Sequence, residues 1–331
     1  MTMIKKMAGH SLPGCAVAAI LLFPYAPLAH SQTQSYPAKP IRFIVSTAPG
    51  GALDITARAI GPKLSSAMGQ QVVVDNRSGA AGNLAADKTA RSLPDGYTLL
   101  MGFVGNLAVN VHLYKGLGYD PLKDLAPVIM AASGSNVLVV HPSVAAKTVR
   151  ELIALGKAQP GKLNSGGSGG MSYLAGILFN SMAGTRIVHV PYKGGAPALT
   201  DLIAGQIELM FAQVVTAVPQ IKAGRIRALA VTTKKRTTIM PELPTVAEAG
   251  LPGYEATLWQ GVAVPAGTPL AVINRLNFEI ARILNMPDVK ETLFRQGLEV
   301  APSTPEAFGA LMKSDHDKWG KIIREAGVSA D

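Results

Sequence analysis

The sequence predicts an α/β protein in which strands and helices alternate. Short apolar runs rich in β-branched residues are followed by segments with helical spacing of apolar residues. The strand segments are continuously apolar, as expected for strands buried on both faces of a parallel sheet. The 34 Gly and 23 Pro residues are spread along the 331-residue chain, which indicates many short connections between elements.

The first series of elements is a predicted βαβαβ unit. The apolar run 41–46 forms its first strand and the segment 54–68 its first helix. A second strand over 70–76, a glycine turn, a helix over 84–93 and a strand over 98–103 complete the unit. We expect these strands to lie parallel in one sheet.

A second series of the same kind follows. Its predicted strands are 137–141, 163–165, 186–192, 207–211 and 227–233, and its predicted helices are 148–157, 171–183, 197–204 and 217–223. A strand over 257–264 and two amphipathic helices, 269–285 and 305–326, end the chain. The second series is thus inserted into the first, and strands 137–141 and 257–264 are the expected crossings between them.

The N-terminus has the features of a secretory signal peptide over residues 1–31. Lys5 and Lys6 precede a short apolar run, and small residues place the expected cleavage near Ser31. The run is too short to span a bilayer of about 30 Å. Cys15 precedes the apolar run instead of following it, so we do not expect lipidation. These features predict an exported protein.

Composition excludes several classes of function. Hydrophobic residues make up 48% and charged residues 16% of the chain, as in a globular protein with a large core. The net charge of +10 comes from scattered side chains, and the only tight basic cluster is 234–236, so no nucleic-acid role is expected. Cys15 is the only cysteine. The exported chain therefore has no disulfide or thiolate nucleophile, and the scattered histidines predict no metal or cofactor.

The loop after the first strand is the first candidate binding site. It contains Pro49, Gly50 and Gly51 and leads into a helix with Asp54 in its first turn. Neither the dinucleotide nor the P-loop fingerprint is present. Free N–H groups at a helix N-terminus bind anions in general, and glycines let a ligand approach the backbone. A plain turn, with Asp54 capping it, is the alternative interpretation.

Two further loops have the same order of strand, glycines and helix. The segment 164–176 carries four glycines and three serines between residues 165 and 172, more than a turn needs. The segment 190–201 offers Tyr192 as a cover for a ligand and Lys193 as a partner for a carboxylate. Trp259 is either a core aromatic residue or a wall of the cleft.

The second loop also fits a competing hypothesis. Residues 166–170 match the G-x-S-x-G nucleophile elbow of serine hydrolases, with Ser168 as the nucleophile. Asp201 or Asp288 followed by His316 would complete the required order. However, His316 lies in a charged helical segment, where a solvated histidine is the ordinary interpretation.

Long ordered motifs of the chain resemble a known family. The segments "IRFIVSTAPGGALDITARAIGPKL", "VPYKGGAPALTDLIAGQIELMF" and "LPTVAEAGLPGYEATLWQGVAVPAGTP" look like Bug-type receptors, the periplasmic solute-binding proteins of tripartite tricarboxylate transport systems. The resemblance extends over residues 36–327. It implies a type II periplasmic-binding-protein fold, with two α/β lobes joined by two crossing strands. We expect lobe 1 to comprise 36–135 and 258–331, and lobe 2 to comprise 136–257.

The resemblance also implies a function and a site. A small carboxylate is expected to bind between the lobes without a cofactor or catalysis, and a monomeric receptor then presents it to a membrane transporter or a sensor. The expected ligand-binding residues are Thr47, Ala48, Pro49, Gly50, Gly51, Ala52, Leu53, Asp54, Gly167, Ser168, Gly169, Gly170, Ser172, Tyr192 and Gln213. The second loop is shorter than the family's usual form. Because Ala212 offers no carboxylate, we expect a ligand without an amino group.

Overall fold

The structure is a computed structural model that describes residues 36–167 and 170–330. The predicted signal peptide, with Cys15, lies outside the described residues, as do Ser168 and Gly169. From Tyr36 onward the chain forms one compact unit that contains two β-sheets.

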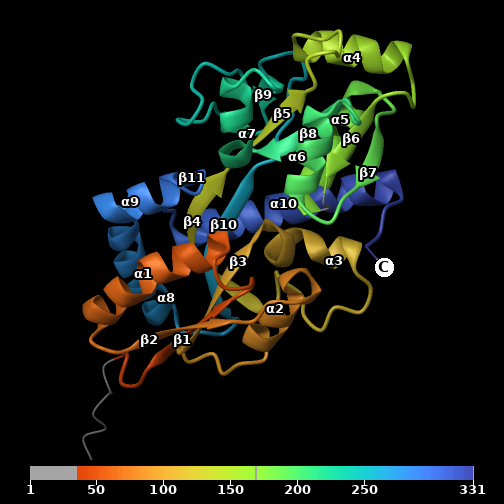
Figure 1. The fold of residues 1–331 in the computed structure, drawn as a ribbon. Coiled ribbons are helices and arrows are strands. Elements are labelled where there is room, and N and C mark those ends of the chain that lie inside the picture. The colour runs from red at the N-terminus through yellow and green to blue at the C-terminus, as the bar shows by residue number, and fades with distance from the viewer. Residues whose placement is uncertain (1–35, 168–169, 331) are drawn as a thin grey trace, which may run out of the picture. The chain divides into compact units, whose positions relative to one another are not determined.

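The first sheet has six strands in the order β11-β4-β10-β3-β1-β2 (Figure 1). They are β1 (Ile41–Val45), β2 (Val72–Asn76), β3 (Thr98–Phe103), β4 (Leu125–Gly134), β10 (Leu258–Pro265) and β11 (Leu298–Val300). Strand β1 pairs in parallel with β2 and β3, which confirms the predicted parallel unit. Strand β10 is antiparallel to both β3 and β4, and β11 is antiparallel to β4.

The second sheet has five strands in the order β7-β6-β8-β5-β9. They are β5 (Asn136–Val140), β6 (Asn164–Gly167), β7 (Val188–Pro191), β8 (Leu209–Gln213) and β9 (Arg227–Val231). Here β6 pairs in parallel with β7 and β8, and β5 is antiparallel to β8 and β9. Both sheets thus have three parallel strands followed by one antiparallel strand.

The antiparallel strand of each sheet begins where the chain enters that sheet. Ser135 alone separates β4 of the first sheet from β5 of the second, and β10 returns the chain to the first sheet at Leu258. Each predicted crossing strand therefore lies wholly in one sheet. The division into the expected lobes stays a prediction.

Ten α-helices connect the described strands. They are α1 (Ala52–Met68), α2 (Asn83–Ala90), α3 (Asn110–Leu113), α4 (Val149–Ala158), α5 (Gly170–Ala183), α6 (Gly195–Ile203), α7 (Val214–Lys222), α8 (Leu270–Leu284), α9 (Pro287–Phe294) and α10 (Pro305–Ala326). A 3₁₀ turn, η1 (Ala80–Gly82), precedes α2, and a π-helical segment, η2 (Gly105–Val109), precedes α3.

Helices cover both faces of the first sheet, which explains why β1 is apolar on both faces apart from Arg42 near its start. Ile41, Phe43 and Val45 are fully buried in a cluster that includes residues of α1 and α8, beside which β1 lies in Figure 1. Ile44, on the opposite face, is equally buried in a second cluster with residues of α2 and α10. Since successive side chains of a strand point to opposite faces, a strand covered on both sides is apolar at each position that is fully buried.

Trp259, which the sequence leaves between core and cleft, is a core residue. It is 2% exposed and packs edge-to-face on Phe308 of α10, with ring centroids 5.4 Å apart. Its Nε1–H donates to Oδ2 of Asp315 at 2.6 Å. The indole therefore joins β10 to α10.

Candidate functional site

The loop after β1 is held at its base and exposed at its tip. Ser46 is buried, donates its hydroxyl to the carbonyl of Met101 at 2.8 Å, and accepts from Nδ2 of Asn106 at 2.8 Å. Residues 48–50 are exposed. The Oγ1 of Thr47 is buried and has no hydrogen-bond partner among the described residues. Hydrogen bonds of Ser46 thus fix the base of the loop, while the hydroxyl of Thr47 has no partner among the described residues.

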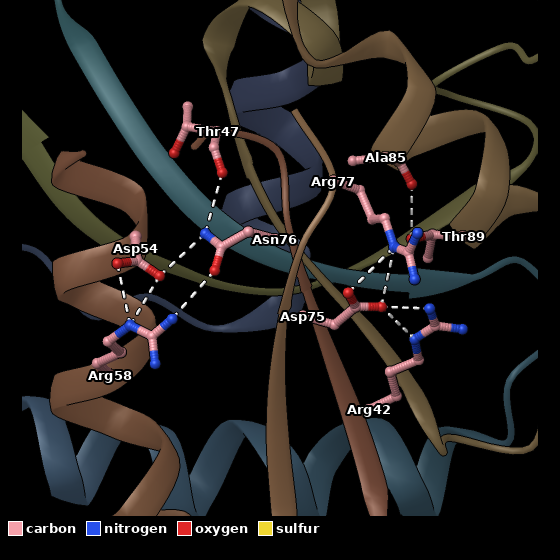
Figure 2. Close-up of polar contacts among 9 residues, drawn as sticks. All are labelled: Arg42, Thr47, Asp54, Arg58, Asp75, Asn76, Arg77, Ala85 and Thr89. Carbon is pink, nitrogen blue, oxygen red and sulfur yellow. Dashed lines mark hydrogen bonds and ion pairs between the residues drawn. The ribbon is translucent and has the colours of Figure 1, made fainter. Parts of the chain in front are cut away.

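Asp54 fixes the shape of this loop (Figure 2). Its Oδ2 accepts the N–H of Gly50 at 2.9 Å. Its Oδ1 accepts Nδ2 of Asn76 at 2.9 Å. The same Asn76 amide donates to the carbonyl of Thr47 at 3.0 Å. Arg58, one helical turn along α1, donates to both carboxylate oxygens at 2.9 and 3.0 Å.

These contacts keep Asp54 ionised although its side chain is only 4% exposed. Burial disfavours the charged form, but hydrogen bonds from Arg58, from the Gly50 N–H and from Asn76 outweigh it and lower the pKa of Asp54. The observed role is that of a group that orients the loop. The N-cap of α1 is Gly51, which offers no side-chain cap to the helix N-terminus, so the first N–H groups stay available to an anion.

A strained turn after β2 lies at the same edge of the sheet. Ala80 and Ala81 have φ of 46° and 53°, between Gly79 at 127° and Gly82 at 83°. Each alanine in this region costs about 1–2 kcal/mol, so the turn needs external support. Asn106 donates to the carbonyl of Gly82, and Asn110 to that of Ala81, both at 3.1 Å.

Sequence reasoning interpreted this turn only as a connection. Strain of this kind gathers at functional sites, and the carboxyl edge of parallel strands is where ligands bind in open α/β sheets. The sequence feature that could have indicated this turn is the pair Asn106 and Asn110, whose side-chain amides can donate hydrogen bonds to its backbone carbonyls.

The matching edge of the second sheet contains a cavity of about 270 Å³. Its lining includes residues at the N-terminal ends of three helices: Met171 and Ser172 of α5, Gly195 and Ala196 of α6, and Gln213 and Thr216 at the start of α7. Neither α6 nor α7 has a side-chain cap at its N-terminus. Asn136, Met210, Phe211 and Leu258 complete the wall. The volume is small compared with the 300–1,000 Å³ of drug-sized sites, so it suits a small ligand.

Of the predicted residues in the second sheet, the structure brings Ser172 and Gln213 together at this cavity. Gly167 ends β6, and a Cβ there would lie 2.7 Å from Oγ of Ser172, so a larger residue would displace that hydroxyl. Gly170 opens α5 with φ of 58°. The residues of the loop 47–54 do not line this cavity.

Tyr192 is engaged elsewhere. Its hydroxyl donates to Oδ2 of Asp201 at 2.8 Å, a hydrogen bond that raises the pKa of Tyr192. It does not line the cavity, so its role as a cover for the ligand stays a prediction.

The described members of the alternative hydrolase triad are not paired with one another. His316 contacts Asp317 through Nδ1 at 3.1 Å and packs on His112. Asp201 accepts from Tyr192, and Asp288 pairs with Lys63 at 2.7 Å. The third member, Ser168, lies outside the described residues.

A larger cavity of about 450 Å³ lies beside α5, between strands β6 and β7 and the end of α10. Ser172 lines both cavities, but Ser165 and His189 of the larger one lie within their strands and not at the carboxyl edge. We therefore assign the site to the smaller cavity. Across residues 36–167 and 170–330, no group of three or more His, Cys, Asp or Glu side chains could hold a metal ion. No helix in these ranges has the length and apolarity needed to cross a membrane.

Comparison with known proteins identifies the family. Residues 56–328 match the model of the tripartite tricarboxylate transporter family receptors. The chain is 36% identical to BugT of Bordetella pertussis over 318 residues, which are 95% of this chain and 97% of BugT.

Two solved structures with ligands are similar throughout. Rpa4515 of R. palustris, with adipate, is 38% identical, with a TM-score of 0.73 over 89% of this chain and 99% of that one. MatC (Rpa3494) from Rhodopseudomonas palustris, with bound malate, is 31% identical, with a TM-score of 0.70 over 87% and 100% of the two chains.

Each of the two sheets has an antiparallel strand at the point where the chain enters it. Together they form the type II periplasmic-binding-protein fold predicted from the sequence, with two α/β lobes. The proteins of this family are solute-binding receptors and not enzymes, which removes the hydrolase hypothesis. The chain belongs to the tripartite tricarboxylate transporter receptors of the Bug type.

Proposed function

We propose that this protein captures a small carboxylate between its two lobes in the periplasm and presents it to a tripartite tricarboxylate transporter. The proposal is supported by adipate and malate in the two similar structures, which are both small dicarboxylates. The observation that carries it for this chain is the cavity at which three helices begin. Backbone N–H groups and helix dipoles at such ends favour a negatively charged ligand.

The proposed mechanism uses both carboxyl edges. The exposed loop 47–54 of the first lobe receives one carboxylate group on the N-terminus of α1, next to Thr47. The second lobe then closes with residues 167–172 and Gln213, and Tyr192 covers the ligand. Closure is favourable because the N–H groups of both lobes contact the anion only when the lobes meet on it.

Further parts of the proposal follow from the family. The chain acts as a monomer, its N-terminal 31 residues direct export and are removed near Ser31, and lobe 1 (36–135 and 258–331) and lobe 2 (136–257) move as units. Because Ala212 is buried and offers no carboxylate, the ligand lacks an amino group.

The experiment is isothermal titration of ligand-free mature protein with a carboxylate panel that includes adipate, malate, succinate and benzoate. We expect saturable heat with at least one member at 1:1 stoichiometry. Titration with the corresponding amides is the control, since a neutral amide does not profit from the helix N-termini. Absence of heat with every carboxylate would refute the proposal.

A further inference from the structure

Asn136 is a buried polar residue whose side-chain oxygen has no partner within the described protein. It is 1% exposed, begins β5, and pairs in register with Gln213. Its backbone is satisfied, because its N–H donates to Oγ1 of Thr232 at 3.2 Å and its carbonyl accepts the N–H of Thr232 at 2.9 Å. Its side-chain Oδ1 is buried without a partner among the described residues.

A buried amide oxygen without a hydrogen-bond partner destabilises the fold, whereas an apolar side chain at this position would not carry that desolvation cost. Asn136 lines the 270 Å³ cavity together with Ser172, Gln213 and Thr216. Because Oδ1 itself has almost no accessible surface, the Asn136 side chain must turn toward the cavity for an occupant to supply the missing partner. An amide oxygen only accepts hydrogen bonds, so the occupant must offer an O–H or an N–H.

The surroundings distinguish between these donors. No Asp or Glu is among the described residues that line the cavity, and the positive ends of three helix dipoles lie at its wall. An ammonium group would be disfavoured there, whereas a neutral hydroxyl would not. The helix ends thus favour a carboxylate, and Oδ1 of Asn136 favours a hydroxyl close to that carboxylate.

We infer that Asn136 is a specificity-determining residue that selects hydroxycarboxylates over the same acids without the hydroxyl. The inference rests on the proposed function, since it concerns the ligand of that same cavity. The hydroxyl of the ligand donates to Oδ1 of Asn136 while a carboxylate of the ligand accepts from the N–H groups at the helix ends.

The test is titration with matched pairs of acids that differ by one hydroxyl: malate with succinate, lactate with propionate, and salicylate with benzoate. We expect the hydroxylated member of the pair that fits best to bind about tenfold more tightly, because the other member leaves Oδ1 unpaired. If carboxylates bind but every hydroxylated acid binds no more tightly than its partner without the hydroxyl, the inference is overturned and the proposed function stays intact. Binding of no carboxylate at all would overturn both.

Variants of Asn136 test whether this residue causes the preference for the hydroxylated acid. Asn136→Ala and Asn136→Val should reduce the tenfold preference to about unity while keeping binding of the unhydroxylated acid. Two variants guard against one failing to fold, which a thermal melt monitors. Gln220→Ala is the matched control, since Gln220 also has a buried, unpartnered amide oxygen but does not line the cavity. A preference that survives in both Asn136 variants would overturn the inference.

Discussion

Asp54 places a negative charge beside a loop that we propose binds an anion. Arg58 offsets that charge with two hydrogen bonds, and the Gly50 N–H and Asn76 use the remaining capacity of the carboxylate. The carboxylate therefore shapes the loop while adding little negative field at its exposed tip. From the sequence, Asp54 caps the turn, orients the loop or receives a ligand donor, and its contacts with Gly50 and Asn76 are those of a group that orients the loop.

The lowered pKa of Asp54 predicts how stability depends on pH. A carboxyl whose pKa is lower when folded stabilises the fold above its unfolded pKa of about 3.9, and this contribution is lost as the pH falls through the folded pKa. Asp54→Asn should cost about 2 kcal/mol at pH 7, and less as the pH falls below about 3.9. Chemical denaturation from pH 7 to pH 3 measures this.

Asp288→Asn provides the comparison for that series. Asp288 pairs with Lys63 but its side chain is 65% exposed, so the substitution should change stability little at any pH. A cost of Asp54→Asn that stays constant down to pH 3 would contradict the proposed role of its charge.

At the scale of elements, the alternation of strand and helix was predictable but several individual elements were not. Strand β4 contains Pro127 and many small residues, and it is held by antiparallel pairing with β10 that includes register shifts. Only two residues separate the end of α8 from the start of α9 at Pro287, and β11 has three residues. Such elements depend on partners distant in sequence more than on local pattern, so periodicity misses them.

The N-terminus of α1 offers a test of the binding loop as an element. Gly51 has φ of −76°, which valine tolerates, but a Cβ there would lie 3.2 Å from Oγ1 of Thr47. Gly51→Val should therefore shift Thr47 and screen the first N–H groups of the helix. We expect carboxylate affinity to fall about tenfold or more, with stability changed by at most about 1 kcal/mol.

Titration of the Gly51→Val variant and a denaturation curve measure the two quantities separately. Gly116→Ala serves as a control at a surface turn: its Cβ would meet nothing within 4 Å, but φ of 69° strains an alanine, so it should cost stability without changing affinity. Unchanged affinity in Gly51→Val would remove this loop from the site.

At the scale of the whole molecule, the fold separates the two halves of the proposed site. The loop 47–54 follows a strand of the six-stranded sheet, whereas the cavity lies at the edge of the five-stranded one. One ligand can use both only if the sheets approach each other around it. The chain passes between the sheets at Ser135 and before Leu258, so these two connections are the expected hinge.

Ligand binding should therefore make the molecule more compact. We expect the radius of gyration from small-angle X-ray scattering to decrease when a bound carboxylate saturates the protein. Gly51→Val at the same ligand concentration should show a smaller decrease. A radius that does not change on saturation would argue against closure and for a site formed by one lobe alone.

The sequence by itself determined the parallel strand–helix series, the glycine loops that follow the strands and the family, because each depends on residues close together in the chain. Only the tertiary structure decided that Asn76 supports Asp54, that Asn106 and Asn110 hold a strained turn, and that Asn136 meets three helix ends at one cavity. These arrangements join residues far apart in sequence. Their chemistry depends on which buried polar atoms have hydrogen-bond partners, and the packing of the folded chain determines those partners.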